Sequence, residues 1–135
     1  MILDLSSSTY ELVKNNITQF FATIFRNNPD YAAVITVSND ENNLTVEETY
    51  RIKNRLKDGS TGKFSKYTIN LYHTTCRILV NGREAQTTFL PKHLTQIRDT
   101  IDSSKELLDQ LDKELRATLS NLYLDYNNVK SDNRK

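Results

Sequence analysis

The chain has 135 residues, of which 37% are hydrophobic, and its net charge is +1, values that suit one folded domain with an elongated part better than two full domains. No apolar run approaches the roughly 18 residues of a membrane span, and the N-terminus lacks the basic start and apolar stretch of a secretion signal. The single cysteine cannot form an internal disulfide, and the two histidines are distant from each other in the chain. We therefore expect an intracellular protein, cytoplasmic or nuclear, without metal or cofactor.

The first predicted element is a helix over about residues 9–27. Ser8 is followed three residues later by Glu11, which is the pattern of a capping box. The apolar side chains then recur at helical spacing, at Val13, Ile17, Phe20, Phe21 and Ile24. Pro29 ends the helix, because a residue before a proline is pushed away from helical angles. The apolar, β-branched run over 31–37 predicts a strand that is buried on at least one face.

Residues 44–57 alternate between apolar and polar side chains. One row holds Leu44, Val46, Tyr50, Ile52 and Leu56, and the other holds Thr45, Glu47, Thr49, Arg51, Lys53, Arg55 and Lys57. Glu48 and Asn54 interrupt the apolar row, and a helix is the alternative because Val46 and Tyr50 are also four residues apart. The two-residue period explains more positions, so we predict a strand whose basic side chains point to one side.

Residues 64–80 predict a β-hairpin. The first strand would have Tyr67, Ile69 and Leu71 on one face and Lys66, Thr68, Asn70 and Tyr72 on the other. The second strand, over 76–80, would pair back onto the first and end at Asn81-Gly82, a dipeptide that tolerates the positive backbone angles of hairpin turns. With the strands at 31–37 and 44–57, the hairpin completes an antiparallel sheet of about four strands, with one covered face and one open face.

The C-terminal part of the chain predicts a long amphipathic helix over 91–128, about 57 Å long if it is continuous. Its apolar residues fall three, four or seven apart from Leu94 to Tyr126. Such a helix is longer than the expected width of the rest of the domain, whose radius of gyration would be about 12 Å. The far half of the helix therefore needs a partner to cover its apolar side. A break at Ser103, which with Glu106 could cap a new helix, is the alternative and would give a helical hairpin. The predicted organisation is an α+β domain at 1–90, this helix at 91–128 and a frayed polar tail at 129–135.

The leucines in the second half of this helix are the residues that we expect to form a homo-oligomer. An apolar stripe is rarely left in water, so packing against the same helix of another copy is favoured over exposure. The expected oligomerisation residues are Leu108, Leu111, Leu115, Leu119 and Leu122. Thr118 and Asp125 interrupt the stripe and argue against a long, regular coiled coil.

Positive charge is concentrated in one stretch of the chain. Residues 1–50 carry a local charge of −5 and residues 84–135 a charge of −1, whereas residues 51–83 hold eight basic side chains and one acidic side chain, a charge of +7. A polyanion would be drawn to that stretch if folding gathers its cations on one face. The alternative is a solvated surface on which lysines and arginines protect strand edges.

Single-stranded nucleic acid is commonly bound by cations that track the phosphates and by exposed rings that stack on the bases. The +7 stretch supplies both, and Tyr72 is the favoured ring because it shares a face with Lys66, Thr68 and Asn70. We therefore predict non-enzymatic binding of RNA or single-stranded DNA through Arg51, Lys53, Arg55, Lys66, Tyr72 and Arg77. The alternative function is a self-assembly or adaptor module that acts through the C-terminal helix without nucleic acid.

Catalytic residues are not evident in the sequence. His73 and Cys76 lie close together in the hairpin turn, but a nucleophile pair needs a groove and an orienting acid, which a short turn does not supply. Ordinary helix-surface pairing with Lys105, Lys113 and Arg116 explains the carboxylates of the last helix, which are Glu106, Asp109, Asp112 and Glu114. The sequence has no glycine-rich phosphate loop, zinc-ligand spacing or nucleophile elbow, so we expect neither enzyme activity nor a small-molecule substrate.

Two resemblances bear on origin and fold. The sequences LYHTT at 71–75 and VNG at 80–82, followed by FLPKHLTQI at 89–97, resemble a hairpin signature in animal open reading frames of retrotransposon-like mobile elements. This resemblance implies an element-encoded accessory protein that handles RNA or single-stranded DNA. The order of elements, a helix, several strands ending in VNGREA at 80–85 and a second helix, is similar to one repeat of the TATA-binding-protein fold, whose concave sheet meets nucleic acid. The second repeat of that fold is absent here, and its apolar wedge residues cannot be placed.

Overall fold

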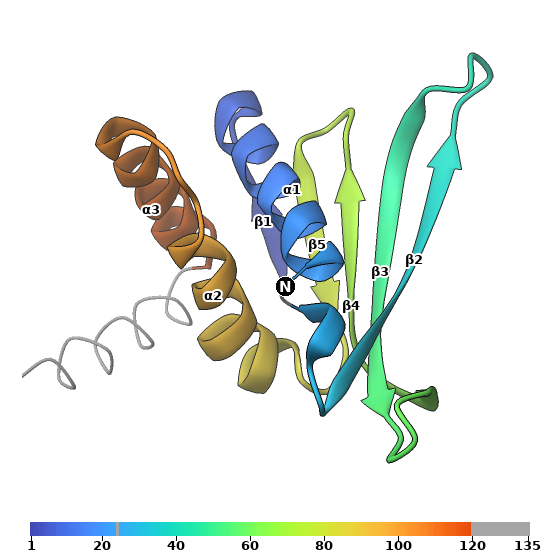
Figure 1. Ribbon diagram of the computed structural model, residues 1–135. Coiled ribbons are helices and arrows are strands. Elements are labelled where there is room, and N and C mark those ends of the chain that lie inside the picture. The colour runs from blue at the N-terminus through green and yellow to red at the C-terminus, as the bar shows by residue number, and fades with distance from the viewer. Residues whose placement is uncertain (24, 120–135) are drawn as a thin grey trace, which may run out of the picture.

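One antiparallel sheet forms a layer of the protein, and the helices cover one of its two faces (Figure 1). The computed structural model describes residues 1–23 and 25–119. Across these residues the sheet has the strand order β1-β5-β4-β3-β2 and consists of β1 (Ile2–Asp4), β2 (Tyr31–Asn39), β3 (Thr45–Arg55), β4 (Thr61–Tyr72) and β5 (Arg77–Asn81). The fold is therefore α+β, as predicted, with five strands in the described residues instead of about four.

The two-residue period predicted the covered face of the central strands correctly. Tyr50 and Ile52 of β3 and Tyr67, Ile69 and Leu71 of β4 are fully buried. Of the other residues in the predicted row over 44–57, Val46 is partly buried, and Leu44 and Leu56 lie outside β3 and are exposed. Tyr50 lies opposite Ile69 in the register of these two strands, so the helical alternative for 44–57 is wrong. β5 pairs back onto β4 as expected, with Ile78 opposite Leu71.

The short strand β1 is missing from the sequence prediction, because three residues are too few for a recognisable alternation. It adds to β5, with Leu3 opposite Ile78, and the Leu3 side chain is fully buried. The amino group of Met1 donates a hydrogen bond to the Val80 carbonyl oxygen at 3.0 Å. β1 therefore forms one edge of the sheet, and β2 forms the other.

The first helix, α1 (Ser7–Ala22), packs on the covered face of the sheet. It begins two residues earlier than the predicted span of 9–27 and also ends earlier, and a 3₁₀ turn, η1 (Phe25–Asn27), leads to Pro29 and β2. Val13, Ile17, Phe20 and Phe21 of the predicted apolar stripe are buried in the core, and Tyr10 joins them. Ile24, the last residue of that stripe, lies outside the described residues. The N-cap residue is Ser6 rather than Ser8.

The prediction of one continuous helix over 91–128 is wrong in the described residues. The chain forms a π-helical segment, η2 (Ala85–His93), a short helix, α2 (Leu94–Asp99), and, after a break at 100–104, α3 (Lys105–Leu119). The Ser104 hydroxyl accepts a hydrogen bond from the Leu107 N–H at 3.3 Å and so caps α3. Arg98 binds the Asp112 carboxylate at 2.7 Å, which joins α2 to α3 as in the helical-hairpin alternative. The rest of the predicted helix, with Leu122, and the tail at 129–135 lie outside the described residues.

The leucines expected to mediate self-association pack inside the chain instead. Leu111, Leu115 and Leu119 are at most 4% exposed and belong to the same apolar cluster as Leu3. Leu108 is partly buried and packs against this cluster. The break before α3 explains the difference, because it lets the helix return to β1 and turn its stripe toward the chain's own core. Within residues 105–119, these leucines are therefore not available on the surface to bind another copy of the chain.

Candidate nucleic-acid interface

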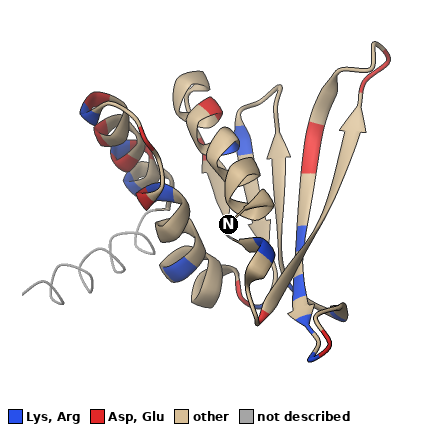
Figure 2. Cartoon of the chain, in the orientation of Figure 1, with Lys and Arg blue, Asp and Glu red and all other residues tan. Residues whose placement is uncertain are grey.

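Charged side chains divide the β2–β3–β4 part of the sheet into two ends of opposite sign (Figure 2). The acidic end consists of the β2–β3 turn and the first half of β3, with Asp40, Glu41, Glu47 and Glu48. The basic end consists of the second half of β3, the β3–β4 turn and the start of β4, with Arg51, Lys53, Arg55, Lys57 and Lys63. Asp58 is an acidic neighbour in the same turn. The sheet therefore has an electrostatic polarity along its strands.

Arg51 and Lys53 point to the open face of the sheet. Both stand one position from Ile52, which is buried on the covered face, and side chains alternate between the faces of a strand. Arg51 donates one hydrogen bond to the Thr36 hydroxyl at 3.1 Å. The Lys53 side chain forms no hydrogen bond or ion pair with another residue of the described chain. Neither cation is neutralised by a carboxylate there, so both are available to an anion.

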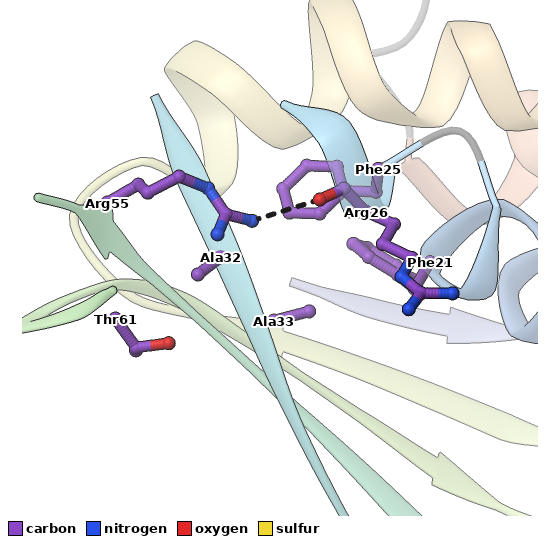
Figure 3. A pocket seen from close by; sticks show the side chains of 7 residues that line it. All are labelled: Phe21, Phe25, Arg26, Ala32, Ala33, Arg55 and Thr61. Atoms are coloured by element: carbon purple, nitrogen blue, oxygen red, sulfur yellow. Dashed lines mark hydrogen bonds between the residues drawn. The ribbon is translucent and has the colours of Figure 1, made fainter. Parts of the chain in front are cut away.

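Arg55 is engaged in the fold, because its guanidinium group donates hydrogen bonds to four backbone carbonyl oxygens. Nε reaches Asn28 at 2.7 Å and Tyr31 at 3.2 Å. Nη1 reaches Gly59 at 2.9 Å, and Nη2 reaches Arg26 at 3.3 Å, the contact drawn in Figure 3. Arg55 thus fastens η1, the start of β2 and the β3–β4 turn together. These contacts use Nε–H and one N–H of each terminal nitrogen and hold the guanidinium group in the fold, so we remove Arg55 from the predicted interface.

Lys66 and Arg77 are each paired with a carboxylate. Lys66 lies 3.4 Å from Glu84, and the register of β4 against β3 shifts at this position, so Lys66 does not follow the predicted alternation. Arg77 lies 2.7 Å from Asp4 on β1. These two pairs are partly exposed and reduce the positive charge that the sequence places in this stretch.

Tyr72, the residue predicted to stack on a base, lies at the acidic end of the sheet. It stands opposite Glu47 on β3 and Arg77 on β5 and is half-buried. Arg51 stands opposite Thr68, which is four residues or about 13 Å from Tyr72 along β4. Lys53 stands opposite Ser65, which is seven residues from Tyr72 but next to Phe64, so the Tyr72 ring lies away from the lysines of the basic end.

Phe64 is an aromatic residue at the basic end that was not among the predicted site residues. Its side chain is 71% exposed, and it follows the exposed Lys63. The Phe64 N–H donates to Asn54 Oδ1 at 3.0 Å, which holds this part of β4 against β3. The signal that could have identified it is a large ring between two lysines just after a glycine, where a buried residue is not expected.

A pocket of about 300 Å³ opens beside the start of β2 (Figure 3). Seven residues line it, namely Phe21, Phe25, Arg26, Ala32, Ala33, Arg55 and Thr61. The two phenylalanine rings are almost fully buried and do not offer a free face for stacking. The Arg26 side chain forms no hydrogen bond or ion pair with the described residues. The pocket therefore adds one available cation close to Arg55.

Three polar side chains, of Tyr10, His73 and Glu48, meet between α1, β3 and the β4–β5 turn. The Tyr10 hydroxyl and His73 Nδ1 are hydrogen-bonded at 2.6 Å, and His73 Nε2 lies 2.9 Å from Glu48. A histidine oriented by a carboxylate is also found in catalytic sites, but the Tyr10 ring is fully buried and cannot reach a substrate. Burial raises the pKa of Tyr10 above its usual value, so the phenol keeps its proton. This group therefore connects α1 to the sheet.

Comparisons with protein-family models, with curated proteins and with solved structures found no match for this chain. The resemblances to mobile-element reading frames and to the TATA-binding-protein fold therefore stay predictions. Within residues 1–23 and 25–119, no cluster of His, Cys, Asp and Glu is suited to hold a metal ion. No helix in these ranges has both the length and the apolar character needed to cross a membrane.

Proposed function

We propose that the protein binds single-stranded nucleic acid, RNA or DNA, without catalysing a reaction on it. The observation that carries the proposal is the basic end of the sheet, which holds the cations of Arg51, Lys53, Lys57 and Lys63 and the exposed ring of Phe64. Phe64 follows Lys63 and precedes Ser65, the partner of Lys53 in the register. Cations that contact phosphates, combined with a ring that stacks on a base, are the usual means of binding single strands without strong sequence preference.

The geometry of β3 suits an extended polyanion. Arg51 and Lys53 are two residues apart on the same face, about 7 Å along the strand, so both can contact one nucleic-acid backbone. Lys57 in the β3–β4 turn and Lys63 at the start of β4 continue the positive charge beyond β3. The acidic end of the sheet would repel phosphates, which confines the contact to the basic end.

Fluorescence anisotropy with labelled oligo-uridine and oligo-thymidine tests the proposal. We expect binding at low salt that weakens linearly on a logarithmic salt scale, because phosphate contacts release counterions. The Arg51→Glu/Lys53→Glu variant should weaken binding by about tenfold or more and flatten the salt dependence by roughly 1.4 in slope, which corresponds to two phosphate contacts.

The matched control is Lys105→Glu/Lys113→Glu, which makes the same change in net charge at two exposed positions of α3. Its affinity should stay close to that of the wild type if binding is local to the sheet. Equal losses in both double variants, or no binding by the wild type at low salt, would overturn the proposal.

Phe64→Ala tests the stacking contact separately. Because the Phe64 side chain is 71% exposed, its removal should leave the folded state intact and still weaken binding by about tenfold, since one base–ring contact contributes about 1–3 kcal/mol. Tyr72→Ala is the comparison, and we expect no loss of affinity from it. If Tyr72→Ala weakened binding and Phe64→Ala did not, Tyr72 would be the stacking ring, as predicted from the sequence, and the binding site would lie toward the acidic end of the sheet.

A further inference from the structure

The two edges of the sheet differ in their protection against pairing with another strand. β1 has three residues, lies beside α3 and carries the Asp4–Arg77 ion pair. β2 has nine residues, YAAVITVSN, without a charge or a proline, and in the described chain it pairs with β3 alone. Natural sheets usually protect an exposed edge with a very short strand, lysine, proline or a bulge. β2 has its register shift only at its end, between Ser38 and Asn39, so 31–37 form a regular, unprotected edge.

The apolar side chains of this edge are exposed to solvent. Val34, Ile35 and Val37 have exposed fractions of 37%, 46% and 58%. Val34 stands opposite Arg51 on the open face, whereas Ile35 and Val37 are on the face of the helices. These two are exposed because β2 extends beyond α1 (Figure 1). The edge therefore offers both apolar side chains and main-chain groups to a partner.

The pairing with β3 identifies the free main-chain groups of β2. The Arg55 N–H donates to the Asp30 carbonyl at 3.0 Å. Bonded pairs alternate along an antiparallel ladder, so every second residue after Asp30 directs its N–H and C=O toward β3. Ala33, Ile35 and Val37 therefore direct theirs to the free edge.

We propose that β2 pairs in antiparallel orientation with β2 of a second copy of the chain, about a two-fold axis at Ile35. In this register Ile35 lies opposite Ile35 of the second copy, and Ala33 lies opposite Val37 of the second copy. All free N–H and C=O groups of the three residues then find partners, in about six hydrogen bonds. Tyr31 is not needed, because its N–H donates to Asn28 Oδ1 at 3.0 Å and its carbonyl accepts from Arg55.

The distribution of charge along β3 favours a second copy of the chain as the partner, in antiparallel orientation. Ala32 lies beside Lys53, and Ser38 lies beside Glu47. Since Ala32 meets Ser38 of the second copy, Lys53 and Glu47 of the second copy stand in one row across the open face. Their backbones are three strand spacings or about 14 Å apart, with only small side chains between them. The two-fold axis produces a second such row, with Glu47 of the first copy and Lys53 of the second. Parallel pairing would instead place the two basic ends side by side, and likewise the two acidic ends.

The pocket at the start of β2 fits the same register. Ala33 lines it together with Phe21 and Phe25, and Ala33 shares the covered face with Ile52 in the β2–β3 register. Val37 is the most exposed apolar residue of the edge, and in the pair it meets Ala33 of the other copy. Val37 of each copy thus packs beside the small side chain of Ala33 of the other copy. The contact lies next to the pocket, on the face of the sheet that the helices cover.

Cysteine cross-linking tests both the pairing and its register. In a Cys76→Ser background, Ile35→Cys places two thiols in an opposed pair with Cα atoms about 5.5 Å apart, within disulfide range. Val37→Cys is the matched control, because Val37 is more exposed but stands about 14 Å from its own copy along the strand. We expect disulfide-linked dimers from Ile35→Cys in a glutathione buffer and few from Val37→Cys. Adding Ala33→Cys to Val37→Cys should restore the cross-link.

Equal cross-linking of the two single variants would overturn this register, and no dimer from Ile35→Cys would overturn the pairing. Sedimentation velocity of the full chain without nucleic acid gives an independent measurement. We expect a dimer that forms with increasing concentration and weakens with salt. Ile35→Lys should be monomeric with an unchanged circular dichroism spectrum, and Leu44→Lys, the same change at an exposed residue outside the pair, should dimerise normally. A wild-type monomer at all concentrations, or equal dimers in both lysine variants, would contradict the inference.

Discussion

The Tyr67 hydroxyl on β4 and Nδ1 of His93 at the end of η2 share a hydrogen bond inside the core. Neither side chain is more than 4% exposed. The rings of Phe20, Phe25 and Tyr31 lie around the imidazole. This contact joins the sheet to the helical layer through polar atoms in surroundings that disfavour a charge.

The first prediction is a loss of stability in mild acid that is caused by His93. Burial, and to a lesser extent the neighbouring Lys92, lower the pKa of His93 from 6.5 to about 4. The unfolded chain therefore takes up this proton first as the pH falls. The free energy of unfolding should be independent of His93 above pH 6.5 and decrease by about 3 kcal/mol between that pH and about 4.

Urea denaturation at a series of pH values measures this effect. His93→Gln is the control, because glutamine keeps a hydrogen-bond acceptor for Tyr67 but does not titrate. Its stability should change less than that of the wild type across the same interval. Parallel pH profiles for the two proteins would show that the proton taken up on unfolding belongs to another group.

The second prediction concerns the hairpin end at Gly82, whose φ is +124°. A Cβ atom there would lie 2.7 Å from Tyr67 Cα and 2.8 Å from the Lys66 carbonyl oxygen. Gly82→Ala should therefore destabilise the protein by about 2 kcal/mol or more, through backbone strain and a clash with β4. Gly59→Ala is the control, since Gly59 has a φ of +89° with no atom near the added Cβ. It should cost about 1 kcal/mol, and equal losses in the two variants would exclude the close approach as a cause.

The sheet could be predicted from the sequence where its strands are long enough to show their period. The alternation from Leu44 to Lys57 identifies β3 and its faces, because a half-buried strand must repeat every two residues. The shift of register at Lys66 breaks that rule and moves its side chain toward Glu84. A local pattern contains no sign of such a bulge, and three residues of β1 contain too little pattern of any kind.

The candidate interface could be predicted only in part, because the partners of its cations come from distant segments. Arg77 pairs with Asp4, 73 residues away, and Arg55 reaches carbonyl groups 24 to 29 residues away in addition to Gly59. Charge counted along the chain includes these residues as if they were free. Arg51 and Lys53 stay available because neither has a carboxylate partner in the described chain.

The third prediction concerns Glu114, which the sequence assigned to surface pairing on its own helix. In the structure its carboxylate accepts hydrogen bonds from the Ser6 N–H at 2.5 Å, the Ser6 hydroxyl at 2.9 Å and the Thr9 hydroxyl. α3 thus supplies the acceptor for the N-terminus of α1, where a negative charge is favourable. Burial works against ionisation, but these hydrogen bonds and that from Gln110 outweigh it and lower the pKa of Glu114.

Glu114→Gln should therefore reduce the free energy of unfolding by about 1–2 kcal/mol at neutral pH, as for other hydrogen bonds to a charged group. The folded-state pKa is the lower one, so this stability is present above the normal pKa of a glutamate and is lost as the pH falls through the folded value. The difference between variant and wild type should shrink accordingly in acid. Glu41→Gln in the exposed β2–β3 turn is the matched control. If Glu41→Gln reduced the free energy of unfolding as much as Glu114→Gln, the hydrogen bonds of Glu114 to the N-terminus of α1 would not explain the effect.

The last prediction separates the structural arginine of the basic end from the available one. Arg55 needs the planar fork of the guanidinium group to reach the carbonyls of Asn28, Gly59 and Arg26 at once. Lysine keeps the charge but cannot make these contacts, so Arg55→Lys should destabilise the protein by about 2 kcal/mol. Arg51→Lys should change stability by less than about 0.5 kcal/mol, because Arg51 is exposed on the open face. Urea denaturation of the two variants measures this difference. If Arg55→Lys were as stable as Arg51→Lys, Arg55 would be free to bind phosphate and would return to the interface from which its four contacts exclude it.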